Sequence, residues 1–500
     1  MPIGRNITVK VEGAGCMSRR LVFLALTFFI LFTWMRPAGA VEDAQSGPAL
    51  IQETMELLET HHLSHPDPAK LTDGAIQGML DSLDDPYAEY FSAEELQGFA
   101  DSLNGDLVGV GIEIRAGEQY PFVVDVIPGT PAAKGGIAAG DLIVAVNGES
   151  TEDLPLAEVV TRIRGVLDSA VTLTLRRGAQ EFDLILHRAA IHVPLVEQDM
   201  LDGGTGYIKI VSFGTRTAEE FDAAMARLKA DGMRSLIVDL RFNGGGYVLE
   251  AIDILDNFIA DDSLAFIIDD GLGHQDEIHT QGKPAFKDLP VVVLVNGLTA
   301  SASEILAGAL QDHGKATLVG DTTYGKGVMQ AVIPLSTGGA LKLTVSRYLT
   351  PAGRDIDIVG LTPDHFVLVH DLQKEIAWQL LHPEDDPDLG FVPGSGKAAL
   401  NSRELDVSID FLQLGNERYL PLRPVLEAML YQVAWQDGVI KIFSGREEIL
   451  TLNTFNSRWN IQPGAFIEQG ISYLPEKILP QLNIDINKEG NKIVLTRRLF

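Results

Sequence analysis

The middle of the chain alternates short apolar runs with helical stretches, and this alternation restricts the fold more than any other feature. Residues 206–210, 235–239, 265–268 and 291–295 are apolar runs long enough for buried strands. Helical patterns at residues 218–230 and 303–312 stand among them. Strands separated by helices predict a parallel or mixed sheet of the α/β class. We expect this core to span residues 191–381.

The segments on either side of this core carry different patterns. A chain of 500 residues is longer than one hydrophobic core usually serves, so we expect several domains in series. Residues 41–103 place apolar residues three and four apart, which predicts a helical region. Residues 104–190 form short β-rich runs broken by Gly, Pro and Asn, which predict a small, mostly β module inserted before the core.

The last part of the chain contains a weak internal repeat. Tyr419-Leu420-Pro421 recurs as Tyr473-Leu474-Pro475, and each copy precedes an apolar helix-like run and then a strand-like run. Two such copies predict a small α+β domain over residues 401–500. The segment 382–400 is rich in Pro, Asp and Gly, which indicates a linker.

The beginning of the chain differs in charge from the rest. The formal net charge of −30 opposes binding to nucleic acid and unaided binding to anionic lipid. The charged residues among residues 1–40 are instead mostly basic, and an apolar stretch at 21–34 ends close to Ala38-Gly39-Ala40. About fourteen apolar residues are short for a membrane span, which needs roughly 20. We therefore predict a signal peptide cut before Val41, with a retained anchor as the alternative.

Export would place the mature protein outside the cytoplasm, as a secreted or periplasmic protein or on the outer face of the cytoplasmic membrane. Cys16 is the only cysteine, and it lies within the predicted signal. The mature chain would therefore contain neither disulfides nor a catalytic thiol.

Ser301 stands where a predicted strand passes into the start of a predicted helix. Ser301-Ala302-Ser303-Glu304 fits a capping box, so a purely structural role is one interpretation. A hydroxyl at a helix N-terminus also suits acyl transfer, because the free N–H groups there can stabilise an oxyanion. Such a serine needs a base, and no histidine stands in an obvious partner motif.

Lys326 is the candidate base, because a buried lysine with a lowered pKa can accept the proton of a serine. Residues 320–327 nearly match the phosphate loop G-x-x-x-x-G-K-[ST], which leaves a nucleotide-binding enzyme as an alternative. Gly327 lacks the hydroxyl that would bind magnesium, and residues 328–333 predict a strand where a phosphate loop is followed by a helix.

These motifs together resemble the carboxyl-terminal processing (tail-specific) family of serine peptidases, over about residues 50–370. Lys326 follows Ser301 by 25 residues, and Gln330 follows Lys326 by four. The resemblance also covers other short motifs: Met200-Leu201-Asp202-Gly203-Gly204, Tyr207-Ile208, Asp239-Leu240-Arg241, Asn243, Gly245-Gly246, Thr299-Ala300, Glu304-Ile305 and Gly325-Lys326-Gly327.

The resemblance implies roles for individual residues. Ser301 would be the nucleophile, Lys326 the general base, and Gln330 the residue that orients the lysine amine. The backbone amides of Gly245 and Ala302 would form the oxyanion hole. A further residue, Asp312, matches an acidic position of the family, where either a supporting role or a solvated helix-terminal carboxylate fits. No metal and no organic cofactor is implied.

Two residues depart from the family pattern. Gly244 stands where the family usually has Pro, and Phe242 stands where Asn is common. The departures predict a looser oxyanion loop. Such a loop would change the rate of the reaction rather than decide whether the protein is active.

The β module resembles a PDZ domain. Its carboxylate-binding loop would be Val108, Gly109, Val110, Gly111 and Ile112. In such domains the amides of this loop hold a terminal carboxylate, while the peptide adds as a strand to the edge of the sheet. Protein or peptide substrates with exposed C-termini are therefore the expected partners.

The C-terminal domain resembles the small stalk-like domain at the amino end of some copper amine oxidases, through Tyr419-Leu420-Pro421-Leu422-Arg423 and Trp435. Residues 400–500 contain no His and no Cys, so a copper site is not expected.

The sequence thus predicts an extracytoplasmic serine endopeptidase that processes or degrades exported proteins from their C-terminal region. The alternative is a catalytically silent, PDZ-containing adaptor of the cell envelope. Attachment to the envelope through the signal anchor or the C-terminal domain, and assembly into a homo-oligomer, are both compatible with the sequence.

Overall fold

The computed structural model describes residues 8–11, 14–18, 46–117, 119–336, 338–455 and 464–499. The chain divides into an inserted unit, residues 94–195, and a larger unit formed by the residues before and after it. The apolar stretch and cleavage site of the predicted signal peptide lie outside the described residues. Within the described ranges, no helix is long and apolar enough to cross a membrane.

The larger unit is built on a six-stranded sheet that contains three of the four predicted buried strands. β12 is antiparallel to β13, and all following neighbours are parallel. The strands are, in their order across the sheet, β12 (Val196–Leu201), β13 (Thr205–Ile210), β14 (Ser235–Asp239), β17 (Val291–Val295), β18 (Ala316–Gly320) and β21 (His365–Phe366). The predicted α/β core is therefore present as a mixed sheet.

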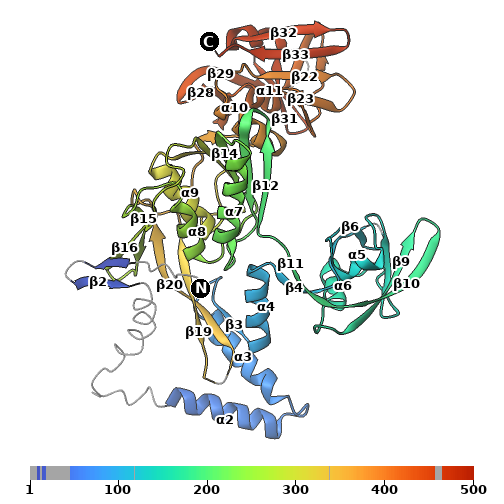
Figure 1. Ribbon diagram of the computed structural model, residues 1–500, viewed down its shortest axis with the longest axis vertical. Helices are drawn as coiled ribbons and strands as arrows, with labels where there is room; N and C mark the ends of the chain where they lie inside the picture. Colours follow the sequence, from blue (N-terminus) through green and yellow to red (C-terminus); the bar gives the residue numbers. More distant parts are fainter. Residues whose placement is uncertain are drawn as a thin grey trace. The chain divides into compact units, whose positions relative to one another are not determined.

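Helices cover both faces of this sheet, which explains why its central strands are apolar throughout. Successive residues of β14 point to opposite faces: Leu236 packs with α7, α8 and α9, whereas Ile237 packs with α10. Figure 1 shows the first three helices grouped beside β14. The helices are α7 (Thr217–Ala230), α8 (Val248–Leu255), α9 (Ala302–Asp312) and α10 (Gln373–Leu381).

The fourth predicted strand lies elsewhere. β15 (Leu264–Asp269) belongs to a second sheet, in which it pairs antiparallel with β16 (Gln275–His279) and β20 (Ala340–Leu349). A short turn rather than a helix follows β15, so its next partner is a hairpin strand. The prediction that residues 265–268 join the α/β sheet is therefore wrong.

This second sheet carries a long hairpin beside the N-terminal region. β19 (Val328–Pro334) pairs with β20, and β20 pairs in turn with β3 (Glu89–Phe91) (Figure 1). The sheet ends in β1 (Thr8–Val11) and β2 (Ala14–Ser18). Helices α2 (Ser46–His61) and α3 (Pro68–Asp81) precede β3, and Asp67 caps α3 by accepting the N–H of Ala69.

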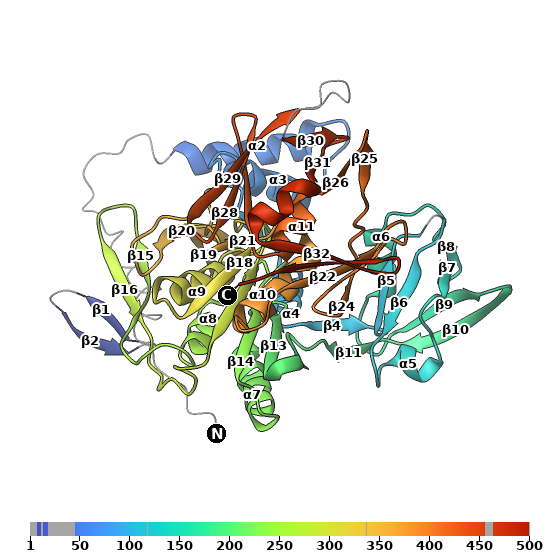
Figure 2. The same ribbon diagram turned by 90° about the horizontal axis from the view of Figure 1, so that it is seen from above.

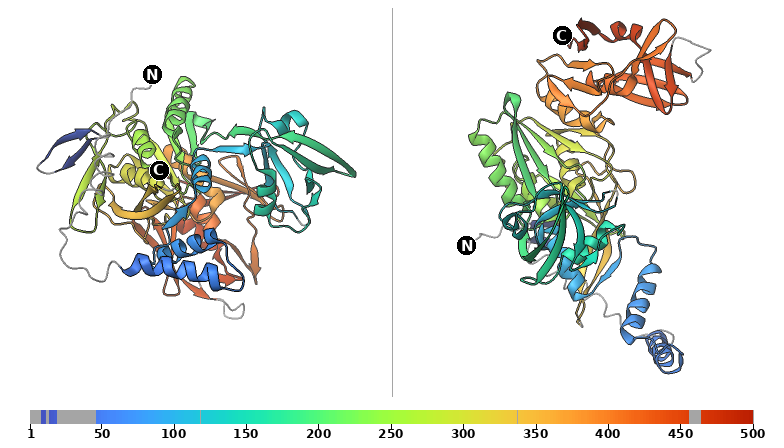
Figure 3. Two further views of the ribbon diagram at one scale, coloured as in Figure 1. Left: turned by 90° about the horizontal axis from the view of Figure 1, so that it is seen from below. Right: turned by 90° about the vertical axis from the view of Figure 1, so that its right-hand side faces the viewer.

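The inserted unit has the mostly β structure expected of its sequence. Its main sheet has the order β10-β9-β7-β6-β5, so β5 is an edge strand, and the β9–β10 hairpin extends at one side (Figure 3). The elements are α4 (Ala93–Leu103), β4 (Asp106–Gly109), β5 (Ile112–Arg115), β6 (Phe122–Val126), α5 (Pro131–Gly135), β7 (Leu142–Val146), β8 (Glu149–Ser150), α6 (Leu156–Ile163), β9 (Ala170–Arg177), β10 (Gln180–His187) and β11 (Ala189–His192).

The C-terminal part contains a five-stranded and a seven-stranded sheet around a short helix, drawn orange to red in Figure 2. Part of the predicted linker 382–400 instead forms two strands of the first sheet, β22 (Asp388–Val392) and β23 (Lys397–Leu400). The other elements of the C-terminal part are β24 (Arg403–Leu405), β25 (Leu412–Leu414), β26 (Glu417–Pro421), α11 (Leu422–Ala428), β27 (Gln432–Gln436), β28 (Val439–Ser444), β29 (Glu447–Phe455), β30 (Ala465–Glu468), β31 (Ile471–Pro475), η3 (Glu476–Leu482), β32 (Ile484–Glu489) and β33 (Lys492–Arg497). Two short helical turns stand earlier in the chain, η1 (Asp202–Gly204) between β12 and β13, and η2 (His370–Leu372) before α10.

The two repeat copies are hydrogen-bonded neighbours, because Tyr419, Leu420 and Pro421 of β26 pair antiparallel with β31, with Leu420 opposite Leu474. The C-terminal strands also share a hydrophobic core with α10 and with the second face of the α/β sheet. The C-terminal part is therefore packed against the core of the larger unit.

Candidate active site

Ser301 has a strained backbone at the turn between β17 and α9. Its φ and ψ are 57° and −119°, a conformation that residues with a Cβ rarely adopt. Strain of this kind costs about 1–3 kcal/mol and is found mostly at functional sites. A sharp strand–turn–helix junction also presents the nucleophile in α/β-hydrolases.

Glu304, in the first turn of α9, is fully buried and binds both candidate catalytic segments. Its Oε2 accepts the backbone N–H of Ser301 at 2.9 Å and that of Lys326 at 3.0 Å. Its Oε1 accepts the N–H of Gly325 at 2.8 Å and the hydroxyl of Thr323. The pKa of Glu304 is raised above its usual value, because burial raises it by more than these hydrogen bonds lower it. The capping box predicted only the bond to Ser301.

Tyr348, on β20, makes a second connection between the same two segments. Its hydroxyl lies 2.7 Å from the carbonyl oxygen of Lys326 and 3.2 Å from that of Ser301. Burial raises the pKa of this phenol well above its usual range. Glu304 and Tyr348 therefore fix the backbones of the predicted nucleophile and base relative to each other.

The side chain of Lys326 is in the environment expected of a base. Burial lowers the pKa of its amine, and the positive charge of Lys342 lowers it further. The amine lies 4.7 Å from the centre of the Tyr87 ring. Within the described ranges, no hydrogen bond joins the amine to Ser301. Because the strand β19 follows at Val328, the phosphate-loop alternative, which requires a helix there, is wrong.

Among the residues that the structure describes, no hydrogen bond joins Gln330 to the amine of Lys326. Its amide donates to Oγ1 of Thr344, at 3.4 Å. The pairing of β19 with β20 is irregular between Met329 and Gln330, and an irregularity of this kind re-aims side chains.

Gly245 and Ala302, the predicted oxyanion donors, lie next to Ser301, the predicted nucleophile. A Cβ on Gly245 would come within 2.8 Å of the Cβ of Ser301 and 3.0 Å of the nitrogen of Ala302, so this approach requires glycine. The N–H of Gly245 donates to Oδ1 of the buried Asn243 at 2.9 Å. Ala302 is the first residue of α9, where N–H groups lack helical partners.

Asp312 lies at the other end of α9. Its carboxylate binds the guanidinium of Arg354 and accepts the N–H of Ala352 at 2.8 Å. These contacts fasten the end of the helix to the loop after β20 and do not involve Ser301 or Lys326.

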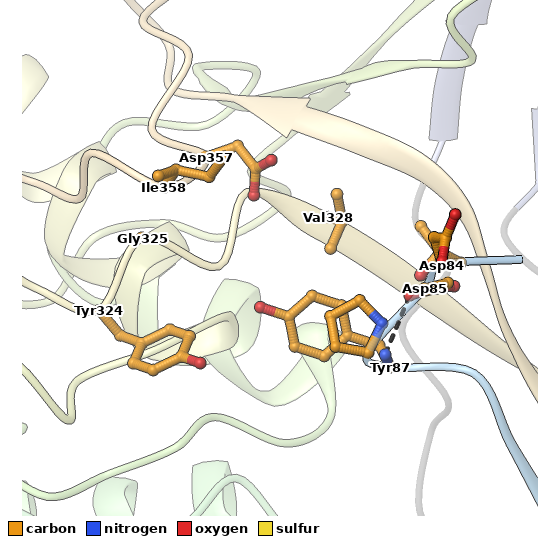
Figure 4. Close-up of a pocket in the computed structure, with 10 residues that line it drawn as sticks. Asp84, Asp85, Tyr87, Tyr324, Gly325, Val328, Asp357 and Ile358 are labelled. Atoms are coloured by element: carbon orange, nitrogen blue, oxygen red, sulfur yellow. Dashed lines mark hydrogen bonds between the residues drawn. The ribbon is translucent and has the colours of Figure 1, made fainter. Parts of the chain in front are cut away.

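A cavity of ≈ 570 Å³ borders Gly325, next to Lys326. In Figure 4 the hydroxyls of Tyr87 and Tyr324 point toward one another, and Asp357 lines the same cavity. Burial and the neighbouring Tyr324 raise the pKa of Tyr87 to about 12. Sequence reasoning missed this cavity, because residues 84–87 are far from Lys326 along the chain.

Only Val110 and Gly111 of the predicted carboxylate loop 108–112 connect β4 to the edge strand β5, because Val108 and Gly109 end β4 and pair with β11, and Ile112 begins β5. The carbonyl of Val110 accepts the N–H of Ala132 at 2.8 Å, and that of Gly111 accepts the N–H of Ile127 at 3.0 Å. Gly111 has a φ of 89°, and a Cβ there would collide with Thr130 at 2.3 Å. The outer edge of β5 pairs with no other strand in the described part of the chain.

Comparison with known proteins decides the family. The model of peptidase family S41 matches residues 204–367. A carboxy-terminal-processing protease of Bartonella bacilliformis is 34% identical over 361 residues, which cover 70% of this chain and 82% of that relative. The chain belongs to the carboxy-terminal-processing proteases of family S41. It is a serine-type peptidase.

Further matches extend over the neighbouring regions of this S41 peptidase. A PDZ domain matches residues 122–177, which confirms the predicted PDZ module, and the N-terminal domain of the activating protease CtpB matches residues 38–95. A probable CtpA-like serine protease of Staphylococcus haemolyticus is 34% identical over 329 residues, which cover 65% of this chain and 66% of that relative. The solved photosystem II D1 C-terminal processing protease is 30% identical, covering 65% of this chain and 94% of that one, with a TM-score of 0.40.

Proposed function

We propose that this peptidase cuts proteins by acyl transfer to Ser301, with Lys326 as the general base. One observation carries the proposal: a single carboxylate oxygen of Glu304 binds the backbone N–H of the strained Ser301 and that of Lys326. The lowered pKa of the Lys326 amine favours the neutral form that a base requires.

In the first half of the reaction, the amine of Lys326 takes the proton of Ser301 Oγ while this oxygen attacks the scissile carbonyl. The N–H groups of Ala302 and Gly245 stabilise the resulting oxyanion. The ammonium then protonates the leaving amine, and the fragment on the carboxyl side departs. In the second half, Lys326 deprotonates a water molecule that hydrolyses the acyl ester, which releases Ser301.

Three local rearrangements would complete the site. The amine of Lys326 leaves the ring of Tyr87 for Ser301, and the N–H of Gly245 leaves Asn243 for the substrate. The amide of Gln330 turns from Thr344 to orient the lysine. The first exchanges a contact with an aromatic ring for a hydrogen bond, and the other two change a hydrogen-bond partner; catalytic contacts are often long before the substrate binds. Asp312 supports the site only by fixing the end of α9.

The PDZ module would recruit the substrate by its C-terminus. The free edge of β5 supports this role, because it can accept a peptide as an additional strand while the loop 108–112 binds the terminal carboxylate. The names of the relatives, carboxy-terminal-processing and CtpA-like proteases, agree with such substrates. We place the reaction outside the cytoplasm on the sequence of residues 1–40. We assign the C-terminal repeat to the stalk-like class, with attachment to the envelope as its role.

The test uses residues 41–500 and an unfolded protein with an apolar C-terminus, whose cleavage is followed by mass spectrometry across a pH series. We expect the wild type to cut, with a rate that rises toward alkaline pH, and we expect Ser301→Ala and Lys326→Ala to be inactive. Lys315→Ala is the matched control, because burial also lowers the pKa of Lys315, which binds carbonyls of Lys287 and Leu289 instead. Cleavage by Ser301→Ala at the wild-type rate would exclude Ser301 as the nucleophile.

A further inference from the structure

Two bulky apolar residues near the site share the unusual backbone of Ser301. Phe242 and Ile358 have φ values of 64° and 66°. A positive φ suits Gly, Asn or Asp, and is an outlier for a bulky or β-branched residue. Both side chains are also exposed, at 58% and 88% of their surface, so they add little to a core. Folding alone does not explain strained, solvent-exposed apolar residues at these positions, whereas contact with a ligand does.

The topology of the sheet puts these residues on opposite sides of Ser301. β17 is the hydrogen-bonded neighbour of both β14 and β18, and all three strands are parallel. Their carboxyl ends therefore meet at one edge of the sheet, where ligands of such sheets bind. Phe242 follows β14, and Ser301 follows β17. Ile358 joins the loop after β18, because its N–H donates to the carbonyl of Gly325 at 2.8 Å.

A second exposed side chain with a large apolar surface, Leu298 or the ring of Tyr324, accompanies each of the two. Oδ1 of Asn296 accepts the N–H groups of both Phe242 and Leu298, each at 3.1 Å, which holds these residues side by side. The ring of Phe242 also meets His370 edge to face, at 5.3 Å. On the other side, Ile358 and Tyr324 both line the cavity, which Asp84, Asp85 and Asp357 line as well (Figure 4).

We infer that Phe242 with Leu298, and Ile358 with Tyr324, form two apolar subsites that bind bulky apolar side chains of the substrate on opposite sides of the cut bond. The inference rests on the proposed role of Ser301 and adds the class of side chain that the substrate presents.

The spacing of the strands fixes the spacing of these side chains. The loops after β14 and β18 are two strand intervals apart, or about 10 Å. An extended peptide covers this distance in about three residues. The substrate should therefore carry one bulky apolar residue on each side of the scissile bond, within about two residues of it.

The test measures kcat/KM of the wild-type mature chain on peptides that differ only in Leu or Ala, at one position before or one position after the cut bond. Phe242→Asn and Ile358→Asn remove the apolar group, while Asn tolerates the left-handed backbone. We expect the wild type to prefer Leu by about tenfold on each side. Each variant should reduce this preference to about twofold on one side only, with the two variants affecting opposite sides and with no fall in Tm.

Leu272→Asn is the matched control, because Leu272 is equally apolar and 85% exposed but lies in the turn between β15 and β16. It should keep both preferences. The inference is overturned if both variants keep the wild-type preferences, or if they lose activity equally on all peptides together with a lower Tm. If the wild type cuts no peptide, or Ser301→Ala cuts as fast, the proposed function fails as well.

Discussion

The Oε2 atom of Glu304 accepts the backbone N–H of Lys326 at 3.0 Å, and the same atom accepts the N–H of Ser301. The proposed nucleophile and the proposed base thus share one buried acceptor, although 25 residues separate them along the chain. Because Glu304 caps α9 and also binds the loop of Lys326, the position of Ser301 relative to Lys326 depends on this one side chain. This dependence can be tested.

We expect Glu304→Gln to lower kcat about 100-fold and the free energy of unfolding by about 2–4 kcal/mol. An amide group in place of either oxygen would face N–H donors, so at least one buried donor would lose its acceptor. Steady-state kinetics and thermal unfolding measure the two effects. Glu384→Gln, at an exposed glutamate, is the control. Wild-type kcat in a folded Glu304→Gln variant would show that the shared acceptor does not position the dyad.

The strain at Ser301 predicts an order of stability between two variants at this position. Ser301→Ala keeps the Cβ that makes a φ of 57° unfavourable, whereas Ser301→Gly removes it. Loss of this backbone strain should stabilise the folded state by about 1–3 kcal/mol. This gain exceeds the roughly 0.5–1 kcal/mol by which glycine stabilises the unfolded chain through its greater conformational entropy. Ser301→Gly should therefore unfold at a higher temperature than Ser301→Ala. The opposite order would mean that the turn is not strained in solution.

The local features of this site could be predicted from the sequence. Ser301 at the junction of a strand and a helix follows from residue patterns within a few positions, as does the strand after Lys326. The Glu304 bond to Ser301 was predicted for the same reason. Its bonds to residues 323–326 were not, because a capping motif gives no information on which distant loop packs against the helix start.

The features that depend on tertiary pairing could not be predicted. Nothing within residues 264–269 specifies that β15 pairs with a hairpin partner rather than with β14 or β17. The Pro, Asp and Gly residues of 382–400 resemble a linker, but β22 also finds a partner in β33, about a hundred residues later. The positive φ values of Phe242 and Ile358 are likewise set by the loops that hold them.

The pH dependence of activity should follow the charge near Lys326. Burial is the main cause of the lowered pKa of its amine, and the positive charge of Lys342 is the second. Because the proposed base would act in its neutral form, kcat/KM should rise as the pH passes through this pKa. Lys342→Gln removes the second cause, so the pKa of Lys326 should rise.

The rising limb of the pH profile should then move to higher pH, with several-fold lower activity near neutral pH and little change at alkaline pH. Lys342→Arg keeps the charge and should keep the wild-type profile, which separates this effect from loss of the Lys342 contact with Glu89. A uniform loss of activity at all pH values in Lys342→Gln would contradict the electrostatic explanation.

His365 predicts that acid destabilises the larger unit. It lies buried on β21, where burial and then the charge of Arg497 lower its pKa to about 4. The unfolded chain, with a histidine pKa near 6.5, binds a proton that the folded chain does not take up between about pH 6.5 and 4. Stability from this group is therefore complete above pH 6.5 and decreases as the pH falls toward 4.

We expect about 2 kcal/mol of this stability to be lost between pH 7 and 4.5. Urea unfolding at the two pH values measures it. His365→Phe fills a similar space without a titrating group, so its unfolding midpoint should fall less on acidification than that of the wild type. His274→Gln, at an exposed histidine, should behave as the wild type. If His365→Phe loses as much stability on acidification as the wild type, other groups set the acid sensitivity, and the packing around β21 is not its cause.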